Sequence, residues 1–95
     1  MAHVSAMDTR SIIGWNLRRL RVAKGLSQER LALECGIDRA YVGRVERGSE
    51  NVTVSTLEAF ANVLGVRVSA LFRDVEPNEP EPMPLKAGRK PKFQN

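Results

Sequence analysis

The sequence predicts an all-α fold, in which a compact bundle of five helices is followed by a disordered C-terminal tail. Apolar residues recur at helical rather than strand spacing from about residue 9 to residue 72. Glycines mark the short gaps between these segments, and all five prolines lie after the last of them. We therefore assign residues 1–8 to a flexible N-terminus, 9–73 to one folded domain, and 74–95 to a Pro/Glu-rich linker and basic tail.

The first two helices have clear start and stop signals. The first covers residues 9–24, where apolar positions recur every three or four residues, and Gly25 follows as a C-terminal stop. Ser27 precedes the second helix, residues 28–35, as an N-cap whose hydroxyl can accept a hydrogen bond from a free backbone N–H. Gly36 ends that helix.

The third helix follows almost immediately, because Asp38 can cap it and it ends near Arg47. Only residues 36–38 separate it from the second helix. That gap is too short for an antiparallel hairpin of long helices and suits a sharp helix-turn-helix. Ala32 is small where two steeply crossed helices must touch. The spacing over residues 28–47 therefore predicts a helix-turn-helix.

The last two helical elements have fewer start and stop signals in the sequence. Ser55 and Glu58 form an S-x-x-E capping box for a fourth helix, which runs to Leu64 and is ended by Gly65. Residues 69–72 can supply a fifth helical turn.

The third helix is expected to present a small and basic outward face. At about 100° per residue, the side chains that point inward are Tyr41, Val42 and Val45. Those that point outward are Ala40, Gly43, Arg44 and Arg47. In a helix-turn-helix, the N-terminal part of this helix enters the DNA major groove. A solvated charged face is the alternative interpretation.

Two arginines on this helix are candidate base readers. Arg39 lies in its first turn and Arg44 on its outward face, and a guanidinium can bond guanine O6 and N7 together. Ala40 offers only a methyl group, which suits a thymine. Gly43 lacks a side chain, and a close approach of its backbone to DNA would compensate for its low helix propensity.

The net charge of +4 belongs to the folded domain, because the four acidic and four basic residues of the tail cancel. The first helix carries a dense basic group that consists of Arg10, Arg18, Arg19, Arg21 and Lys24. Of these, Arg18, Arg19 and Arg21 are candidate phosphate contacts, which give affinity without sequence information. Ordinary solvation of these charges is the alternative.

The composition argues against an enzyme, a metal centre or a cofactor site. Cys35 is the only cysteine and His3 the only histidine, so neither a disulfide, a zinc cluster nor a histidine base within the fold is expected. We read Cys35 as a small, mostly buried apolar residue. The sequence also lacks a signal peptide and a membrane span, which favours a cytoplasmic protein.

Several short motifs together resemble the lambda-repressor/Cro-like, or XRE-type, helix-turn-helix family. They are LSQERLA, GI, VERG and LGV, and the resemblance covers roughly residues 12–72. It implies a five-helix bundle that binds double-stranded operator DNA as a homodimer. The function that follows is a sequence-specific transcriptional regulator, a repressor acting on a near-palindromic operator.

The resemblance also implies roles for single residues. Gln28 matches a glutamine that bonds a phosphate and braces the recognition helix. Base-reading positions of the family correspond to Arg39, Ala40 and Arg44, and phosphate contacts to Tyr41 and Arg47. Arg21 and Glu46 match a partly buried ion pair that ties the first helix to the end of the third.

The C-terminal helices are expected to form the dimer interface. Its residues would be Leu57, Phe60, Leu64, Val68, Leu71 and Phe72. An alternative function is that of an antitoxin or a restriction-modification controller, whose tail or helical surface binds a protein partner.

Overall fold

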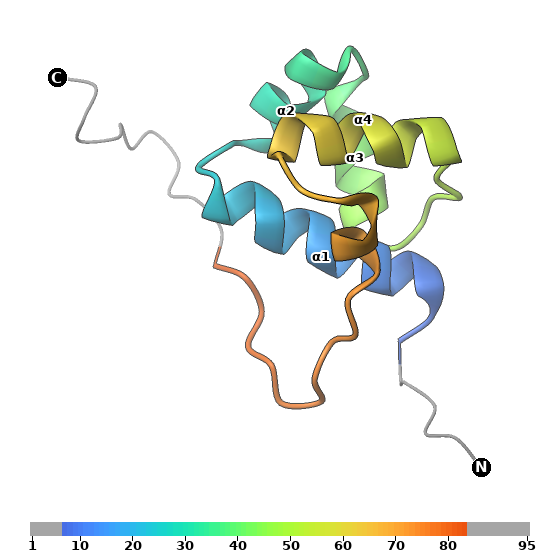
Figure 1. Cartoon of the computed structure of the whole chain (residues 1–95), viewed down its shortest axis with the longest axis vertical. Helices are drawn as coiled ribbons and strands as arrows, with labels where there is room; N and C mark the ends of the chain where they lie inside the picture. Colours follow the sequence, from blue (N-terminus) through green and yellow to red (C-terminus); the bar gives the residue numbers. More distant parts are fainter. Residues whose placement is uncertain (1–6, 84–95) are drawn as a thin grey trace, which may run out of the picture.

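Residues 7–83 are described by a computed structural model, and the elements within this range are all helical (Figure 1). They are α1 (Thr9–Ala23), α2 (Gln28–Cys35), α3 (Arg39–Glu46), α4 (Val54–Leu64) and the 3₁₀ helix η1 (Val68–Phe72). The all-α expectation is confirmed, but the fifth element is a 3₁₀ helix rather than an α-helix. Predictions for residues 1–6 and 84–95, which include the basic end of the tail, lie outside the described residues.

The helices α1, α2 and α4 each begin at a short polar side chain that accepts a backbone hydrogen bond. Asp8 Oδ1 accepts from the N–H of Ser11 at 2.8 Å, and Ser27 Oγ accepts from the N–H of Arg30 at 3.0 Å. The Ser27 cap is as predicted. Asp38 also precedes α3 as predicted, but its side chain makes no capping hydrogen bond.

The predicted start of α4 is wrong. Thr53 is the N-cap, and its Oγ1 accepts from the N–H of Thr56 at 3.1 Å. Ser55 already lies inside the helix, so it cannot form a capping box with Glu58. The threonine two residues earlier competes successfully because its hydroxyl reaches a free N–H of the first turn, and the helix gains residues at its start.

One apolar core joins all five elements. Its largest fully buried side chains include Phe60, Leu17, Leu31 and Leu71. α1 packs against α3, α4 and η1, while α2 packs against α3 and α4. No helix within residues 7–83 is both long and apolar enough to cross a membrane.

The core overturns most of the predicted dimer interface. Leu57, Phe60, Leu64 and Leu71 are all core residues, at most 6% exposed. The apolar stripe of α4 is needed to cover α1, α2 and η1, so it is not free for a second copy of the chain. Of the expected interface, only half-buried Val68 and Phe72, which is 41% exposed, reach the surface.

A glycine sets the distance between α1 and α3. A Cβ atom on Gly14 would lie 2.3 Å from the carbonyl oxygen of Val45 and 2.8 Å from that of Glu46. Both obstacles are backbone atoms, so no side-chain rotation could relieve the clash. No sequence pattern marks Gly14, because its role depends on how closely α1 and α3 cross in space.

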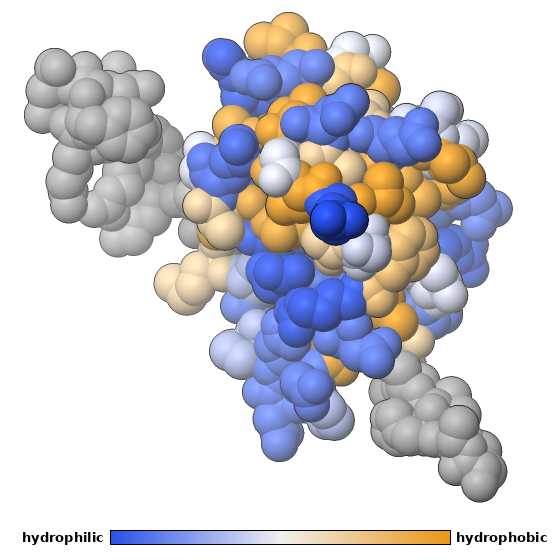
Figure 2. All heavy atoms as spheres, in the orientation of Figure 1, coloured by the Kyte–Doolittle hydropathy of each residue, from blue (hydrophilic) through white to orange (hydrophobic). Residues whose placement is uncertain are grey.

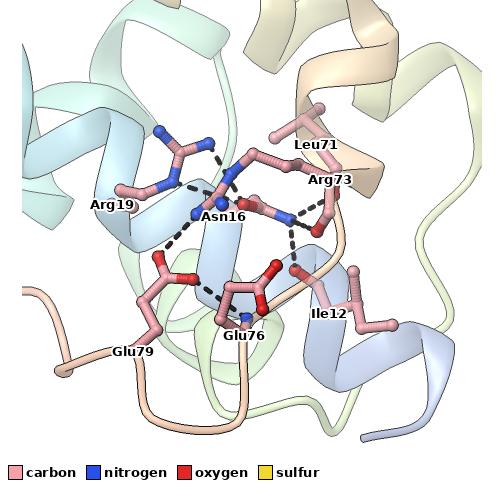
Figure 3. Close-up of polar contacts among 7 residues, drawn as sticks. All are labelled: Ile12, Asn16, Arg19, Leu71, Arg73, Glu76 and Glu79. Atoms are coloured by element: carbon pink, nitrogen blue, oxygen red, sulfur yellow. Dashed lines mark hydrogen bonds and ion pairs between the residues drawn. The ribbon is translucent and has the colours of Figure 1, made fainter. Parts of the chain in front are cut away.

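A buried asparagine fastens the chain that follows η1 to α1. Asn16 Nδ2 donates to the carbonyl oxygens of Ile12 (3.0 Å), Leu71 (3.2 Å) and Arg73 (2.8 Å), and Arg19 donates to Asn16 Oδ1 (Figure 3). Asn16 is fully buried. Its amide therefore satisfies backbone carbonyls at both ends of the domain.

The first residues of the expected tail make polar contacts near the same place. Arg73 Nη2 donates to Glu79 Oε2 at 2.6 Å, and the N–H of Glu76 donates to Glu79 Oε1 at 3.1 Å (Figure 3). Residues 73–79 thus form a closed polar turn beside Asn16 and Arg19. Composition did not indicate these contacts, because they depend on spatial proximity rather than on residue type.

Candidate nucleic-acid interface

α3 has one face in the core and the opposite face in solvent. Val42 and Val45 anchor it, at 0% and 1% exposed. The exposed side chains of this helix and its last turn are Arg39, Ala40, Arg44 and Arg47. α2 packs directly against α3, and the turn between them contains Gly36 at φ 70° (Figure 1). The arrangement is the helix-turn-helix that the spacing predicts.

Gly43 lies on the outward side of α3 as expected, but it is buried because neighbouring side chains cover it. A Cβ atom placed there would meet Arg47 Nη1 at 3.3 Å and Gln28 Oε1 at 3.9 Å. The side chains of Gln28 and Arg47 therefore cover this glycine. Its missing side chain makes room for Gln28 and Arg47 on the surface of α3.

A buried ion pair fixes α3 to α1. Arg21 Nε donates to Glu46 Oε2 at 2.6 Å and Arg21 Nη2 to Glu46 Oε1 at 3.0 Å, with side chains only 7% and 5% exposed. Arg21 Nη1 donates to the carbonyl of Leu26 at 2.8 Å. The ion pair implied by the resemblance is present. Arg21 is wrong as a phosphate contact, since its guanidinium is buried and occupied.

Gln28 belongs to the same network. Its Nε2 donates to Glu46 Oε1 at 3.0 Å, which joins the start of α2 to the end of α3. The bracing role expected of Gln28 is therefore visible, whereas its phosphate contact stays a prediction. Because Glu46 accepts a hydrogen bond from the Gln28 amide, the orientation of this amide is already fixed in the unbound protein.

Arg19 lies on a different side of α1. Arg19 and Arg21 are two positions apart and so point in nearly opposite directions around the helix. Arg19 faces Asn16 and the polar turn of residues 73–79. Burial lowers the pKa of Arg19, the nearby Arg73 lowers it further, and Glu79 opposes them. Arg19 therefore faces the polar turn, and the phosphate contacts expected of Arg19 and of half-buried Arg18 stay predictions.

Arg44 is paired with an acid that the sequence did not single out. Arg44 Nε donates to Glu50 Oε2 at 2.6 Å, and the two side chains are 44% and 25% exposed. The Arg44 guanidinium carbon also lies 5.7 Å from the centroid of the Tyr41 ring. One candidate base reader is thus held by two neighbours, whereas Arg39 forms no ion pair within residues 7–83.

The described residues offer little for metal or thiol chemistry. No group of three His, Cys, Asp or Glu side chains within residues 7–83 could hold a metal ion. Cys35 is half-buried, and its Sγ donates to the carbonyl of Ala59 at 3.7 Å. Burial raises the pKa of the Cys35 thiol, and Glu34 raises it further. The thiol is therefore a weak nucleophile at neutral pH.

A family model described as helix-turn-helix, HTH_3, matches residues 17–71, more than half of the chain. The chain belongs to this XRE-type helix-turn-helix family. Its α2 and α3 both lie within the matched residues. The exposed face of α3 is thus the outer face of a helix-turn-helix.

Individual relatives agree with the family assignment. This helix-turn-helix protein is 49% identical over 65 residues to a hypothetical transcription factor of Neisseria meningitidis serogroup B, which covers 68% of this chain and 61% of the relative. It is 43% identical over 71 residues to control protein C.SmaI of Serratia marcescens, which covers 75% and 84%.

Solved structures share the fold. The Neisseria hypothetical transcription factor NHTF superposes with a TM-score of 0.69 at 41% identity, covering 77% of this chain and 84% of that chain. The restriction-modification controller C.AhdI from Aeromonas hydrophila superposes with a TM-score of 0.65 at 48% identity, covering 66% and 96%. The helix-turn-helix protein therefore shares its folded part with named regulators.

Proposed function

We propose that this protein is a sequence-specific, double-stranded DNA-binding transcriptional regulator whose α3 enters the major groove. The observation that carries the proposal is the division of α3 into two faces. Val42 and Val45 are buried, while three arginines and a small alanine remain exposed on the other side. A helix of this kind fits the major groove and brings donors to guanine edges.

The exposed residues fall into two groups by role. Arg39 and Arg44 read bases, and Ala40 leaves space or meets a thymine methyl. Tyr41, Arg47 and Gln28 bind phosphates, which give affinity and salt dependence without sequence information. Gly43 contributes indirectly, because its lack of a side chain leaves room for the side chains of Gln28 and Arg47.

The protein acts as a homodimer on a near-palindromic site. Figure 2 shows apolar side chains gathered over α4 and η1, with hydrophilic ones around them and one strongly hydrophilic side chain among them. Val68 and Phe72 belong to η1 and reach this surface. A two-fold contact here would present two copies of α3 to the same DNA, about 34 Å apart. One related structure, C.Esp1396I at 32% identity, is described as a tetramer in complex with its natural 35 base-pair operator.

Among regulators, a restriction-modification controller is the more specific candidate. Control proteins C.SmaI and C.BamHI are 43% and 39% identical to this chain, and the aligned parts span 84% and 82% of their lengths. Repression by covering a promoter is the simplest action for a domain of this size. Measuring transcription from a reporter that carries the selected site would separate repression from activation.

The test is selection of DNA from a random duplex pool at stated salt, followed by binding measurements on three variants. Arg44→Ala should relax the preference at one base position, whereas Arg47→Ala should weaken all sequences alike. Arg30→Ala removes an exposed arginine of α2 that pairs with Glu34; it is the matched control and should change neither the base preference nor the affinity. Failure of the wild-type protein to enrich any sequence would refute the proposed function.

A further inference from the structure

We propose that Glu50 is a specificity-determining positioning residue, which holds Arg44 for base reading and keeps it from acting as a general phosphate ligand. This inference rests on the proposed DNA-binding function. Its starting point is the 2.6 Å bond from Arg44 Nε to Glu50 Oε2. Nη1 and Nη2 of Arg44 make no hydrogen bond with residues 7–83, so they are the donors that remain for a base.

The backbone, not only the side chains, places Glu50 beside Arg44. The N–H and the hydroxyl of Ser49 both donate to the carbonyl oxygen of Arg44 at 3.0 Å. Gly48, at φ 76°, turns the chain back at the end of α3, and its N–H donates to the carbonyl of Val45 at 3.0 Å. Glu50 therefore follows a turn that is fastened to Arg44 itself.

The Tyr41 ring restricts the same guanidinium from a second direction. Its centroid lies 5.7 Å from the guanidinium carbon of Arg44. An arginine that is bonded at Nε and lies over a ring has fewer accessible rotamers than a free one. Binding a base then costs less conformational entropy, which is the advantage of a preorganised donor.

The charge of Glu50 has a second effect. A carboxylate on a DNA-facing surface is repelled by phosphates, and it cancels the charge of Arg44 at long range. The pair as a whole is neutral, so it adds little to non-specific attraction. The directional donors of Arg44 persist, however, and they are satisfied only by a correctly placed acceptor such as guanine O6 or N7. Glu50 thus raises the ratio of specific to non-specific affinity.

The experiment compares wild-type protein with Glu50→Ala and Glu50→Gln on the selected duplex and on random duplex, over a series of salt concentrations. We expect Glu50→Ala to lower the specific-to-random affinity ratio by about tenfold. The slope of log affinity against log salt on random DNA should steepen by about 0.9, because one more cation is free to bind a phosphate. Glu50→Gln keeps an acceptor for Nε and should preserve more of the ratio than alanine.

Two controls isolate the pair. Glu58→Ala removes an exposed acid from α4 and should leave the ratio unchanged. In an Arg44→Ala background, Glu50→Ala should no longer lower the ratio, because its effect depends on Arg44. Thermal unfolding followed by circular dichroism confirms that each variant is folded.

The outcomes separate this inference from the proposed function. If the wild-type protein selects a sequence and Glu50→Ala strengthens selected and random binding equally, Glu50 acts only as a repulsive charge and the inference is overturned. An unchanged ratio, or the same loss with and without Arg44, overturns it as well. If the wild-type protein selects no sequence, the proposed function fails and the role of Glu50 in specificity fails with it.

Discussion

Asn16 Nδ2 lies 2.8 Å from the carbonyl oxygen of Arg73, although 57 residues separate them in the chain. The same amide also bonds the carbonyls of Ile12 and Leu71. α1 thereby holds the end of η1 in place (Figure 3). Since α1 also packs on α3, the asparagine is part of the framework that supports the exposed arginines.

Replacing Asn16 with alanine should destabilise the domain. The substitution leaves buried carbonyl oxygens without a donor, and each such group costs about 1–3 kcal/mol. We expect the free energy of unfolding in urea to fall by about 2–3 kcal/mol. Asn62→Ala, at an exposed position of α4, is the matched control and should change stability by less than about 0.5 kcal/mol. Equal midpoints for the two variants would contradict the structural role of Asn16.

Two glycines in neighbouring helices should respond to alanine in opposite ways. At Gly14 the new Cβ would meet backbone oxygen at 2.3 Å, so α1 and α3 would have to separate. We expect a loss of several kcal/mol, or no folded protein. At Gly43 the nearest atom is the end of the Arg47 side chain at 3.3 Å, and alanine favours helix by about 1 kcal/mol over glycine.

Thermal unfolding of both glycine variants checks this pair. Gly43→Ala should remain folded and unfold at the wild-type temperature or higher. It should nevertheless bind DNA more weakly, because the shifted Arg47 no longer meets its phosphate in the proposed complex. If Gly14→Ala is as stable as wild type, the helices do not cross as closely as described.

Capping residues and glycines predicted most helix ends correctly. The prediction failed where a helix end depends on contacts with the rest of the fold. Ser27 and Gly36 act within one turn of chain, so the sequence was sufficient for them. At the start of α4, Thr53 and Ser55 offer similar hydroxyls two residues apart. Which of them caps the helix depends on where the loop meets the core, and the sequence alone did not decide it.

The site was predicted where its residues lie on one helix and missed where it depends on contacts between elements. Helical periodicity indicated the exposure of Arg44, but not its bond to Glu50, which needs the turn after α3. The apolar stripe of α4 was recognised, yet periodicity cannot tell a core from an interface. Burial of Phe60 and Leu71 decided that question.

Breaking the Arg21–Glu46 pair should cost far more than breaking a surface pair. Glu46→Ala leaves a buried guanidinium without its partner and also frees Gln28, so we expect a loss of about 3–5 kcal/mol. Glu34→Ala removes the exposed partner of Arg30, a pair worth at most about 1 kcal/mol. Urea unfolding of the two variants measures the difference, and similar losses would show that the Glu46 pair adds nothing through burial.

In the wild-type protein, acid should loosen the polar turn of residues 73–79, because Glu79 becomes protonated. A variant that lacks the Glu79 carboxylate should show no such change with pH. The hydrogen bond from Arg73, followed by that from the N–H of Glu76, lowers the pKa of Glu79 below its ordinary value of 4.5. A lowered pKa in the folded state means that the ionised carboxylate stabilises the fold above pH 4.5. This contribution is lost as the pH falls through the lowered pKa. The pH dependence can be followed by the NMR signal of the Trp15 indole N–H. This N–H is buried and makes no full hydrogen bond, and it interacts weakly with Glu79.

In wild-type protein that indole signal should shift as Glu79 is protonated, below pH 4.5. Glu79→Gln cannot lose a charge there, so its Trp15 signal should not titrate over the same range. Glu81→Gln removes an exposed acid two residues away and should titrate like wild type. If the signal titrates identically in all three proteins, the protonation that it reports is not that of Glu79, and the Arg73–Glu79 bond does not hold the turn against α1.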